Sequence, residues 1–255
     1  MTVRDIIALI EGIAPLHYQD EWDNSGLQVG LPDAPVSKGL LCLDVTEEIV
    51  DEAASKGCEM IVSHHPLIFR ALKQVSCSSY QQRCVMKAVC SGIAIYSAHT
   101  SLDNAKGGVN YEIAARLGLQ NLSFLSPSPS GEWGSGVVGE LAAPLSDEAC
   151  AAMLKEQFAV EALRCSQLTG REIKRVAVCG GSGAFLMRDA LRAGADCFVC
   201  GEFHYHDYFE NDGLFLLELG HYQSEQYTID VLERLLEGKV ETIKTAIMTN
   251  PICYR

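Results

Sequence analysis

Six of the seven histidines in this 255-residue sequence follow apolar segments of the kind that form buried strands. In an open parallel sheet, ligands bind beyond the carboxyl ends of the strands. Imidazoles with nearby carboxylates at such an edge suit zinc, manganese, iron or nickel better than calcium. The pattern therefore predicts a metal site, and its candidate residues are His64, His65, His99, Asp103, Glu202, His204, His206, Asp207, His221 and Glu225.

The spacing of these residues favours two ions. His221 and Glu225 are four residues apart and share one face of a helix. Adjacent side chains leaving a strand are expected to diverge, so His64 and His65 would each serve one of two neighbouring ions. Glu225 could bridge the pair, and two ions about 3.5–4 Å apart would activate a water. His99 and Asp103 could share a helical turn or be separated by a loop.

Each residue also has a purely structural interpretation. A histidine at a strand end is commonly a hydrogen-bonded loop residue, and His221 with Glu225 could simply stabilise the start of a helix. The doublet His64–His65 is harder to explain by packing. His204 and His206 are the weakest candidates for direct ligands.

Strands alternate with helices along most of the chain, which predicts an α/β fold of two similar lobes with mainly parallel sheets flanked by helices. The segment 122–136 is rich in Ser, Pro and Gly and is the best linker candidate. We therefore expect a first lobe over 1–125 and a second over 126–255, with the dinuclear site between them. The tail from residue 240 could add an edge strand.

Three further motifs allow two interpretations each. The segment 180–185, "GGSGAF", could cradle an anion or form a tight strand-to-helix turn. The segment 22–30, "WDNSGLQVG", could wall the pocket with Trp22, Asp23 and Asn24, or merely close the lobe. Cys197 and Cys200 form a CxxC motif, but a strand would point them to opposite faces, which argues against a redox or zinc pair.

The net charge of −13 argues against a nucleic-acid binder but leaves room for a nucleotide bound through cations. No window is long and apolar enough to span a membrane. The N-terminus carries charges within its apolar stretch, which is atypical of a signal peptide. These features predict a cytoplasmic protein.

The motifs "WDNSGLQVG", "CLDVTEEIVDEA", "SHHPLIF", "SAHTSLDNAKGGVN", "GEFHYHD" and "GHYQSE" together resemble the NIF-three-like family, often labelled GTP cyclohydrolase 1 type 2 homologues. The resemblance spans nearly the whole chain as a single family domain, in the short bacterial form. It implies a toroidal homohexamer and two divalent ions (Zn, Fe, Mn or Ni). The ligands it implies are His64, His65, Asp103, His221 and Glu225, with His99 as an acid/base or outer residue and Glu202 and His206 close by.

The resemblance implies metal-dependent opening of the guanine imidazole ring of GTP, with release of formate. Phosphoester or amide hydrolysis are alternatives for an enzyme of this kind. A non-enzymatic role, as a metal-storing or regulatory ring that binds a partner, also fits the acidic composition. The sequence alone therefore leaves catalysis itself undecided.

Overall fold

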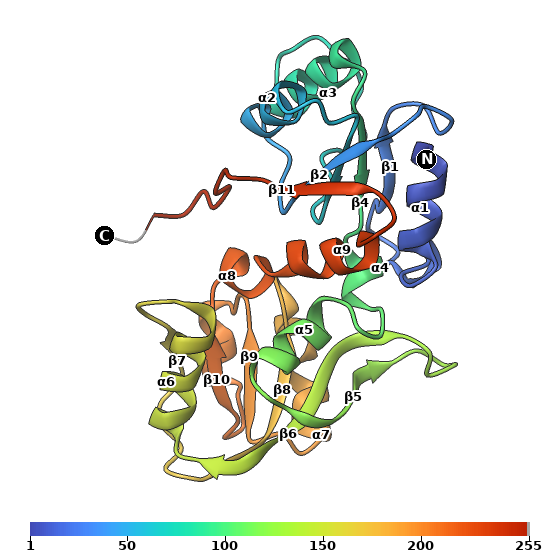
Figure 1. Ribbon diagram of the computed structural model, residues 1–255. Coiled ribbons are helices and arrows are strands. Elements are labelled where there is room, and N and C mark those ends of the chain that lie inside the picture. Colours follow the sequence, from blue (N-terminus) through green and yellow to red (C-terminus); the bar gives the residue numbers. More distant parts are fainter. Residues whose placement is uncertain (254–255) are drawn as a thin grey trace. The chain divides into compact units, whose positions relative to one another are not determined.

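A computed structural model of the protein describes residues 1–253 and divides the chain into two compact units, each built on its own sheet (Figure 1). The first unit comprises residues 1–102 and the chain from Thr228 onward, and the second comprises residues 103–227. The chain thus leaves the first unit once and returns to it. Its units divide after Leu102 and after Tyr227, whereas the linker composition places a boundary at 125/126.

The first unit holds a five-stranded sheet of order β1-β4-β3-β2-β11, in which β1 is antiparallel and the other strands are parallel. Its helices are short, and three of them begin at side-chain caps, such as Thr46, whose hydroxyl accepts from the Ile49 amide. Its elements are α1 (Val3–Glu11), η1 (Leu16–Tyr18), β1 (Gly26–Val29), β2 (Lys38–Cys42), α2 (Glu47–Ser55), β3 (Met60–Ser63), α3 (Tyr80–Ser91), β4 (Ala94–Ser97), the start of α4 (Thr100–Asp103), α9 (Thr228–Leu236) and β11 (Glu241–Lys244).

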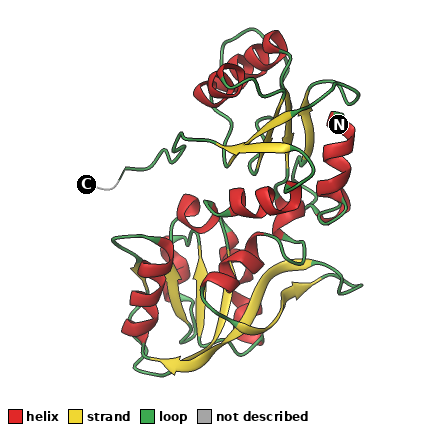
Figure 2. Cartoon of the chain, in the orientation of Figure 1, coloured by secondary structure: helices red, strands yellow, loops and turns green. Residues whose placement is uncertain are grey.

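Helices cover both faces of this sheet, which explains its nearly continuous apolar strands. Helices α2 and α3 pack together over a core that includes Leu40, Ile61 and Ile95. The alternate residues Leu41 and Met60 are also fully buried, and α9 packs on β2 and β11 with α1 beside it (Figure 2). The edge strand predicted for the tail is confirmed as β11.

The second unit holds a six-stranded sheet of order β5-β6-β8-β9-β10-β7. Only β8, β9 and β10 run parallel, so the prediction of mainly parallel sheets is wrong for this unit, whose sheet is mixed. Its elements are the end of α4, α5 (Val109–Arg116), β5 (Gln120–Pro127), β6 (Gly134–Leu145), α6 (Asp147–Phe158), β7 (Arg164–Cys165), β8 (Ile173–Cys179), η2 (Gly183–Leu186), α7 (Met187–Arg192), β9 (Cys197–Cys200), η3 (Tyr205–Phe209), β10 (Phe215–Glu218) and α8 (His221–Glu225).

The Ser, Pro and Gly residues of segment 122–136 belong to a β-hairpin rather than to a linker. Strand β5 pairs antiparallel with β6 through Phe124 opposite Val137 and Pro127 opposite Gly134. Proline is tolerated there because β5 is an edge strand. A Cβ at Gly134 would lie 2.6 Å from the Ser126 carbonyl oxygen, so glycine is required where the two strands approach closely.

Over residues 1–253, the helices are all too short or too polar to cross a membrane. The longest helices, α3 and α6, have 12 residues each.

Gly30 directly follows β1 and lies close to Ala94 of β4. We predict that Gly30→Ala destabilises the first unit. The φ of Gly30 is +113°, and a Cβ there would lie 2.7 Å from the Cβ of Ala94. The strain should lower the free energy of unfolding by about 2 kcal/mol, measured by urea denaturation. Gly39→Ala is the matched control, since its Cβ would meet nothing closer than 3.8 Å. Equal effects of the two substitutions would contradict this explanation.

Candidate metal centre

Three histidine rings gather at the carboxyl edge of the first sheet. Ser63 of β3 pairs in parallel register with Ser97 of β4, so the two strands end at the same level. His64 and His65 follow the first strand and His99 the second, and one ring nitrogen of each lies within 4.8 Å of the others. The prediction of a histidine cluster at this edge is therefore confirmed.

The rings of His64 and His65 do not diverge as the sequence analysis expects. Their centroids are 4.8 Å apart. The backbone bends after Ser63, and the His65 carbonyl oxygen lies 2.9 Å from the Ser63 hydroxyl and 3.2 Å from the Ser97 hydroxyl. The two hydroxyls are themselves 2.8 Å apart. This buried serine pair fixes the backbone from which both imidazoles project.

Each of the three imidazoles is oriented through its Nδ1. That of His64 lies 2.9 Å from the Ala98 carbonyl, that of His65 2.7 Å from Asp44, and that of His99 2.6 Å from Asp23. A carbonyl or an ionised carboxylate only accepts hydrogen bonds, so each Nδ1 donates. The Nε2 of each ring then carries the lone pair that can bind a cation, and such outer partners are typical of metal-binding histidines.

Asp23 is the partner of His99 and the best-anchored acid of the first unit. Its carboxylate also accepts hydrogen bonds from the hydroxyls of Thr100 and Ser25, at 2.5 and 2.8 Å, and from the Thr100 amide at 3.1 Å. Burial by itself would raise the pKa of Asp23, but the His99 imidazole and the two hydroxyls outweigh it and hold this pKa well below its usual range. Asp23 is therefore an ionised group that positions His99.

Asp44 positions His65 in the same way, through a hydrogen bond to its Nδ1. Burial would raise the pKa of Asp44, but the hydrogen bond and charge of His65 and the hydroxyl of Thr249 together lower it. Asp44 is not among the residues predicted from sequence, and Asp23 was expected either to wall the pocket or to close the lobe. Asp44 could have been found, because it lies just beyond the carboxyl end of β2, as the histidines lie beyond β3 and β4.

In the second unit, His221 and Glu225 of α8 lie near Glu202, which follows β9. His221 and Glu225 share one helical face as predicted, with His221 Nε2 3.1 Å from a Glu225 oxygen. Glu202 lies 3.3 Å from His221 Nδ1 and accepts from the Ser182 hydroxyl at 2.6 Å. Burial would raise the pKa of Glu202, but Ser182 and His221 lower it. The Glu225 carboxylate is buried, with 5% of its side chain exposed.

The glycine pair Gly180–Gly181 makes room for Glu225. A Cβ at Gly181 would lie 2.3 Å from a Glu225 oxygen, and its φ is +57°. The amides of the pair already donate to Asn110 and Ser224, at 2.9 and 3.0 Å. Of the two interpretations of "GGSGAF", the tight strand-to-helix turn is thus the one the structure supports.

The remaining predicted residues fall in different settings. Asp103 ends helix α4, so His99 and Asp103 are joined by a helical turn rather than by a loop. His204 is almost fully exposed and lies 3.5 Å from Asp207, while the exposed His206 contacts the rings of Tyr205 and Phe209. Within residues 1–253, neither of these two histidines joins a group of candidate metal ligands.

The CxxC motif is part of the core. Cys197 and Cys200 lie in β9 and are both fully buried. Burial raises the pKa of the Cys200 thiol to about 12, so the thiolate that binds metal or exchanges disulfides is strongly disfavoured. The expectation that this pair is structural agrees with its position.

The class of protein follows from comparison of the whole chain. The family model described as "Duf34/NIF3 (NGG1p interacting factor 3)" matches residues 1–251. The chain belongs to this family, as its motifs suggest. The same match extends over both units, so the family domain is the two units together.

Particular relatives match over nearly their full length. A GTP cyclohydrolase 1 type 2 homolog of Clostridium perfringens is 36% identical, over 98% of each chain. One from Clostridium acetobutylicum is 32% identical, over 98% of this chain and 96% of its own length. A crystal structure of a Staphylococcus aureus protein superposes on this chain with a TM-score of 0.93 at 27% sequence identity. The crystal structure of a Bacillus cereus protein related to NIF3 superposes with a TM-score of 0.90 at 25% identity. Each superposition covers 100% of this chain and 99% of the other chain.

We predict that Asp23→Asn destabilises the metal-free protein at pH 7 by about 2–3 kcal/mol, because charge-assisted hydrogen bonds are lost. A depressed native pKa stabilises the fold above the unfolded pKa of about 4, and this contribution is lost as the pH falls through the native value. The difference from wild type, measured by urea unfolding, should therefore shrink between pH 5 and pH 3. The exposed Asp33→Asn is the control, and a difference independent of pH would contradict the assignment.

Asp44→Asn should weaken binding of Mn²⁺ or Zn²⁺ by about 10- to 100-fold, because the substituted amide holds the His65 ring without a charge. Isothermal titration of chelator-treated protein measures the affinity. Asp51→Asn, an exposed change on α2 of the same unit, is the matched control. Unchanged affinity in Asp44→Asn would show that this carboxylate does not support a metal ligand.

Proposed function

We propose that the protein is a metal-dependent hydrolase with a dinuclear centre. The observation that carries the proposal is the convergence of three imidazoles whose Nδ1 atoms all face hydrogen-bond acceptors, so that the Nε2 lone pair can bind a cation at His64 and His65 and accept a proton at His99. The proposed ligands are His64, His65, Asp103, His221 and Glu225, with Glu225 as the bridge.

The donor atoms suit the proposed ions. Imidazole nitrogen and carboxylate oxygen are the usual ligands of zinc, manganese, iron(II) and nickel. The groups of candidate ligands found among residues 1–253 contain imidazoles and carboxylates but no thiol. His64 and His65 would supply imidazole ligands and the carboxylates would complete the two positions, while His99 would stay outside the ligand set.

Chain connectivity supports contributions from both units. Helix α4 joins His99 of the first unit to Asp103, the first residue of the second, with a rise of about 6 Å. Glu225 precedes Thr228, where the chain re-enters the first unit, by three residues or about 11 Å of extended chain. Both crossings thus fall beside proposed ligands in the sequence.

His99 is proposed to carry the proton in this reaction. When bound, the divalent ions supply Lewis acidity and lower the pKa of water. Asp23 holds His99 with its proton on Nδ1, so Nε2 can accept a proton from the attacking water. The ionised Asp23 then stabilises the imidazolium that forms. Proton return to the leaving group uses the same Nε2.

The named substrate candidate comes from the relatives, which are described as GTP cyclohydrolase 1 type 2 homologs. The reaction would be hydrolytic opening of the guanine imidazole ring of GTP with formate as a product. Phosphoester hydrolysis and amide hydrolysis would use the same residues and are the alternatives to opening of the GTP ring. The toroidal homohexamer implied by the family remains part of the proposal.

The prediction is that metal-loaded protein releases formate from GTP, and that His64→Ala and Glu225→Gln lower the rate at least about 100-fold, because each removes a proposed ligand. A formate-coupled assay measures the rate, with a panel of phosphoesters and amides in parallel. His17→Ala is the control, since His17 is the one histidine away from the strand ends.

Two results would separate the alternatives. Absence of turnover across the whole panel, together with a rise in melting temperature on metal addition, would favour the non-enzymatic role. Turnover that survives both ligand substitutions would contradict the proposed centre.

A further inference from the structure

Two large aromatic side chains lie exposed beside His99. Trp22 is 59% exposed and Phe69 is 45% exposed. Their ring centroids lie 6.0 and 6.2 Å from that of His99, and 5.8 Å from each other. All three residues belong to the first unit. An exposed indole and phenyl ring at a candidate catalytic histidine form an apolar surface that the fold itself does not use.

The backbones that carry these rings are firmly held. Trp22 precedes Asp23, the buried carboxylate with several hydrogen-bond donors. Phe69 follows Ile68, whose carbonyl accepts from Asn24 at 2.6 Å and whose amide donates to Gln28 at 3.2 Å. The side chains of the "WDNSGLQVG" segment therefore fix both loops while leaving the rings open. Such rigid, exposed rings are prepared to bind a ligand without losing much conformational entropy.

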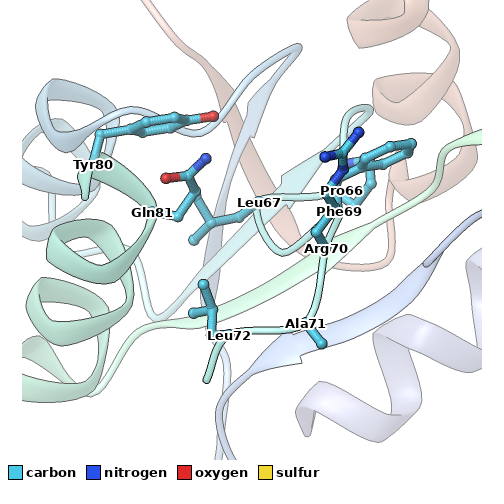
Figure 3. A pocket seen from close by; sticks show the side chains of 8 residues that line it. All are labelled: Pro66, Leu67, Phe69, Arg70, Ala71, Leu72, Tyr80 and Gln81. Carbon is cyan, nitrogen blue, oxygen red and sulfur yellow. The ribbon is translucent and has the colours of Figure 1, made fainter. Parts of the chain in front are cut away.

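A cavity of about 330 Å³ adjoins Phe69, within the range of small-molecule sites. Residues of the loop 66–72 line it, together with Tyr80 and Gln81 of α3, which face the loop across the opening (Figure 3). Phe69 lines the cavity and its ring centroid lies 6.2 Å from that of His99, so the cavity reaches the histidine cluster through Phe69. Its wall combines an aromatic ring, a phenol, an amide and the guanidinium of Arg70.

Arg70 supplies the positive charge of this cavity. Its side chain is exposed, and over residues 1–253 no carboxylate lies within ion-pair distance of it. The chain has a net charge of −13, so carboxylates are plentiful. Within the described part of the chain, the positive charge of Arg70 is nevertheless not paired with one of them, and it can attract an anionic ligand. A guanidinium binds phosphate or carboxylate oxygens through two parallel hydrogen bonds.

We infer that this face binds an anionic ligand with a planar heteroaromatic ring, of the class of nucleoside phosphates. The ring packs against Trp22 and Phe69, whose centroids are 5.8 Å apart and whose planes are tilted by 59°, so it stacks on one of them and meets the other at an angle. The anionic group enters the cavity and pairs with Arg70. The ring is thereby held at His99. The inference deepens the proposed function by assigning substrate-positioning residues, but binding itself does not require that the reaction occur.

Equilibrium dialysis with GTP, guanosine and inorganic triphosphate tests the two halves separately, on full-length metal-loaded protein. Trp22→Leu and Phe69→Leu should weaken GTP and guanosine about 10- to 100-fold and leave triphosphate unchanged. Trp22→Phe should restore most of the affinity. Arg70→Gln should weaken GTP and triphosphate but leave guanosine unchanged.

Phe209→Leu and Arg188→Gln are the matched controls, because they remove an exposed ring and an exposed guanidinium in the second unit. A second measurement uses Trp133→Phe protein, in which Trp22 is the remaining tryptophan. GTP should quench its fluorescence and triphosphate should not. Unchanged GTP affinity in Trp22→Leu, or a change in oligomeric state in place of ligand affinity, would overturn the inference.

The outcomes separate this inference from the proposed function. GTP binding that depends on Trp22 without any formate release would support the ligand-binding face and contradict the proposed hydrolase. Formate release with a KM unaffected by Trp22→Leu or Arg70→Gln would support the hydrolase and contradict the ligand-binding face.

Discussion

The chemistry available to the first unit depends on the hydrogen bonds at Nδ1 of its three histidines. An imidazole has two nitrogens, and the group that occupies one decides what the other can do. Here a backbone carbonyl and two carboxylates occupy Nδ1 of His64, His65 and His99. Nε2 is therefore the nitrogen of each ring that can react or bind a cation. Loss of Asp23 or Asp44 would leave the ring of His99 or His65 without its orienting partner, but it would not remove the ring itself.

The ionised carboxylates beside the histidines carry negative charge into a partly buried region. Asp23 and Asp44 keep lowered pKa values despite burial, because donors and imidazoles surround them. The carboxylate Glu225 is buried in the second unit, held over the glycine pair at 180–181. Cations are the groups that would balance such charge in a chain with a net charge of −13. The acidic composition and the donor set thus lead to the same kind of cofactor.

Membership of the Duf34/NIF3 family establishes the fold more firmly than the reaction. Fold similarity alone does not define an activity, which has to be argued from the site. The site here offers an oriented imidazole at His99, paired with a buried Asp23, and aromatic surface from Trp22 and Phe69. These features are the ones on which the proposed hydrolytic reaction depends.

Much of this protein could be predicted from sequence because strand ends are local features. The apolar runs and the polar residues after them placed His64, His65, His99, His221 and Glu225 at sheet edges, and the helical spacing of the last two was confirmed. The edge strand of the tail and the buried CxxC strand were predicted for the same reason: each depends on a few neighbouring residues.

Tertiary structure decided what depends on pairing between distant segments. Hairpin β5–β6 and the mixed second sheet follow from which strands pair, and composition does not encode that choice. The partnership of Asp23 with His99 joins residues 76 positions apart, and that of Asp44 with His65 joins residues 21 apart. The side-by-side rings of His64 and His65 result from the bend at Ser63, which is fixed by a hydroxyl from the neighbouring strand.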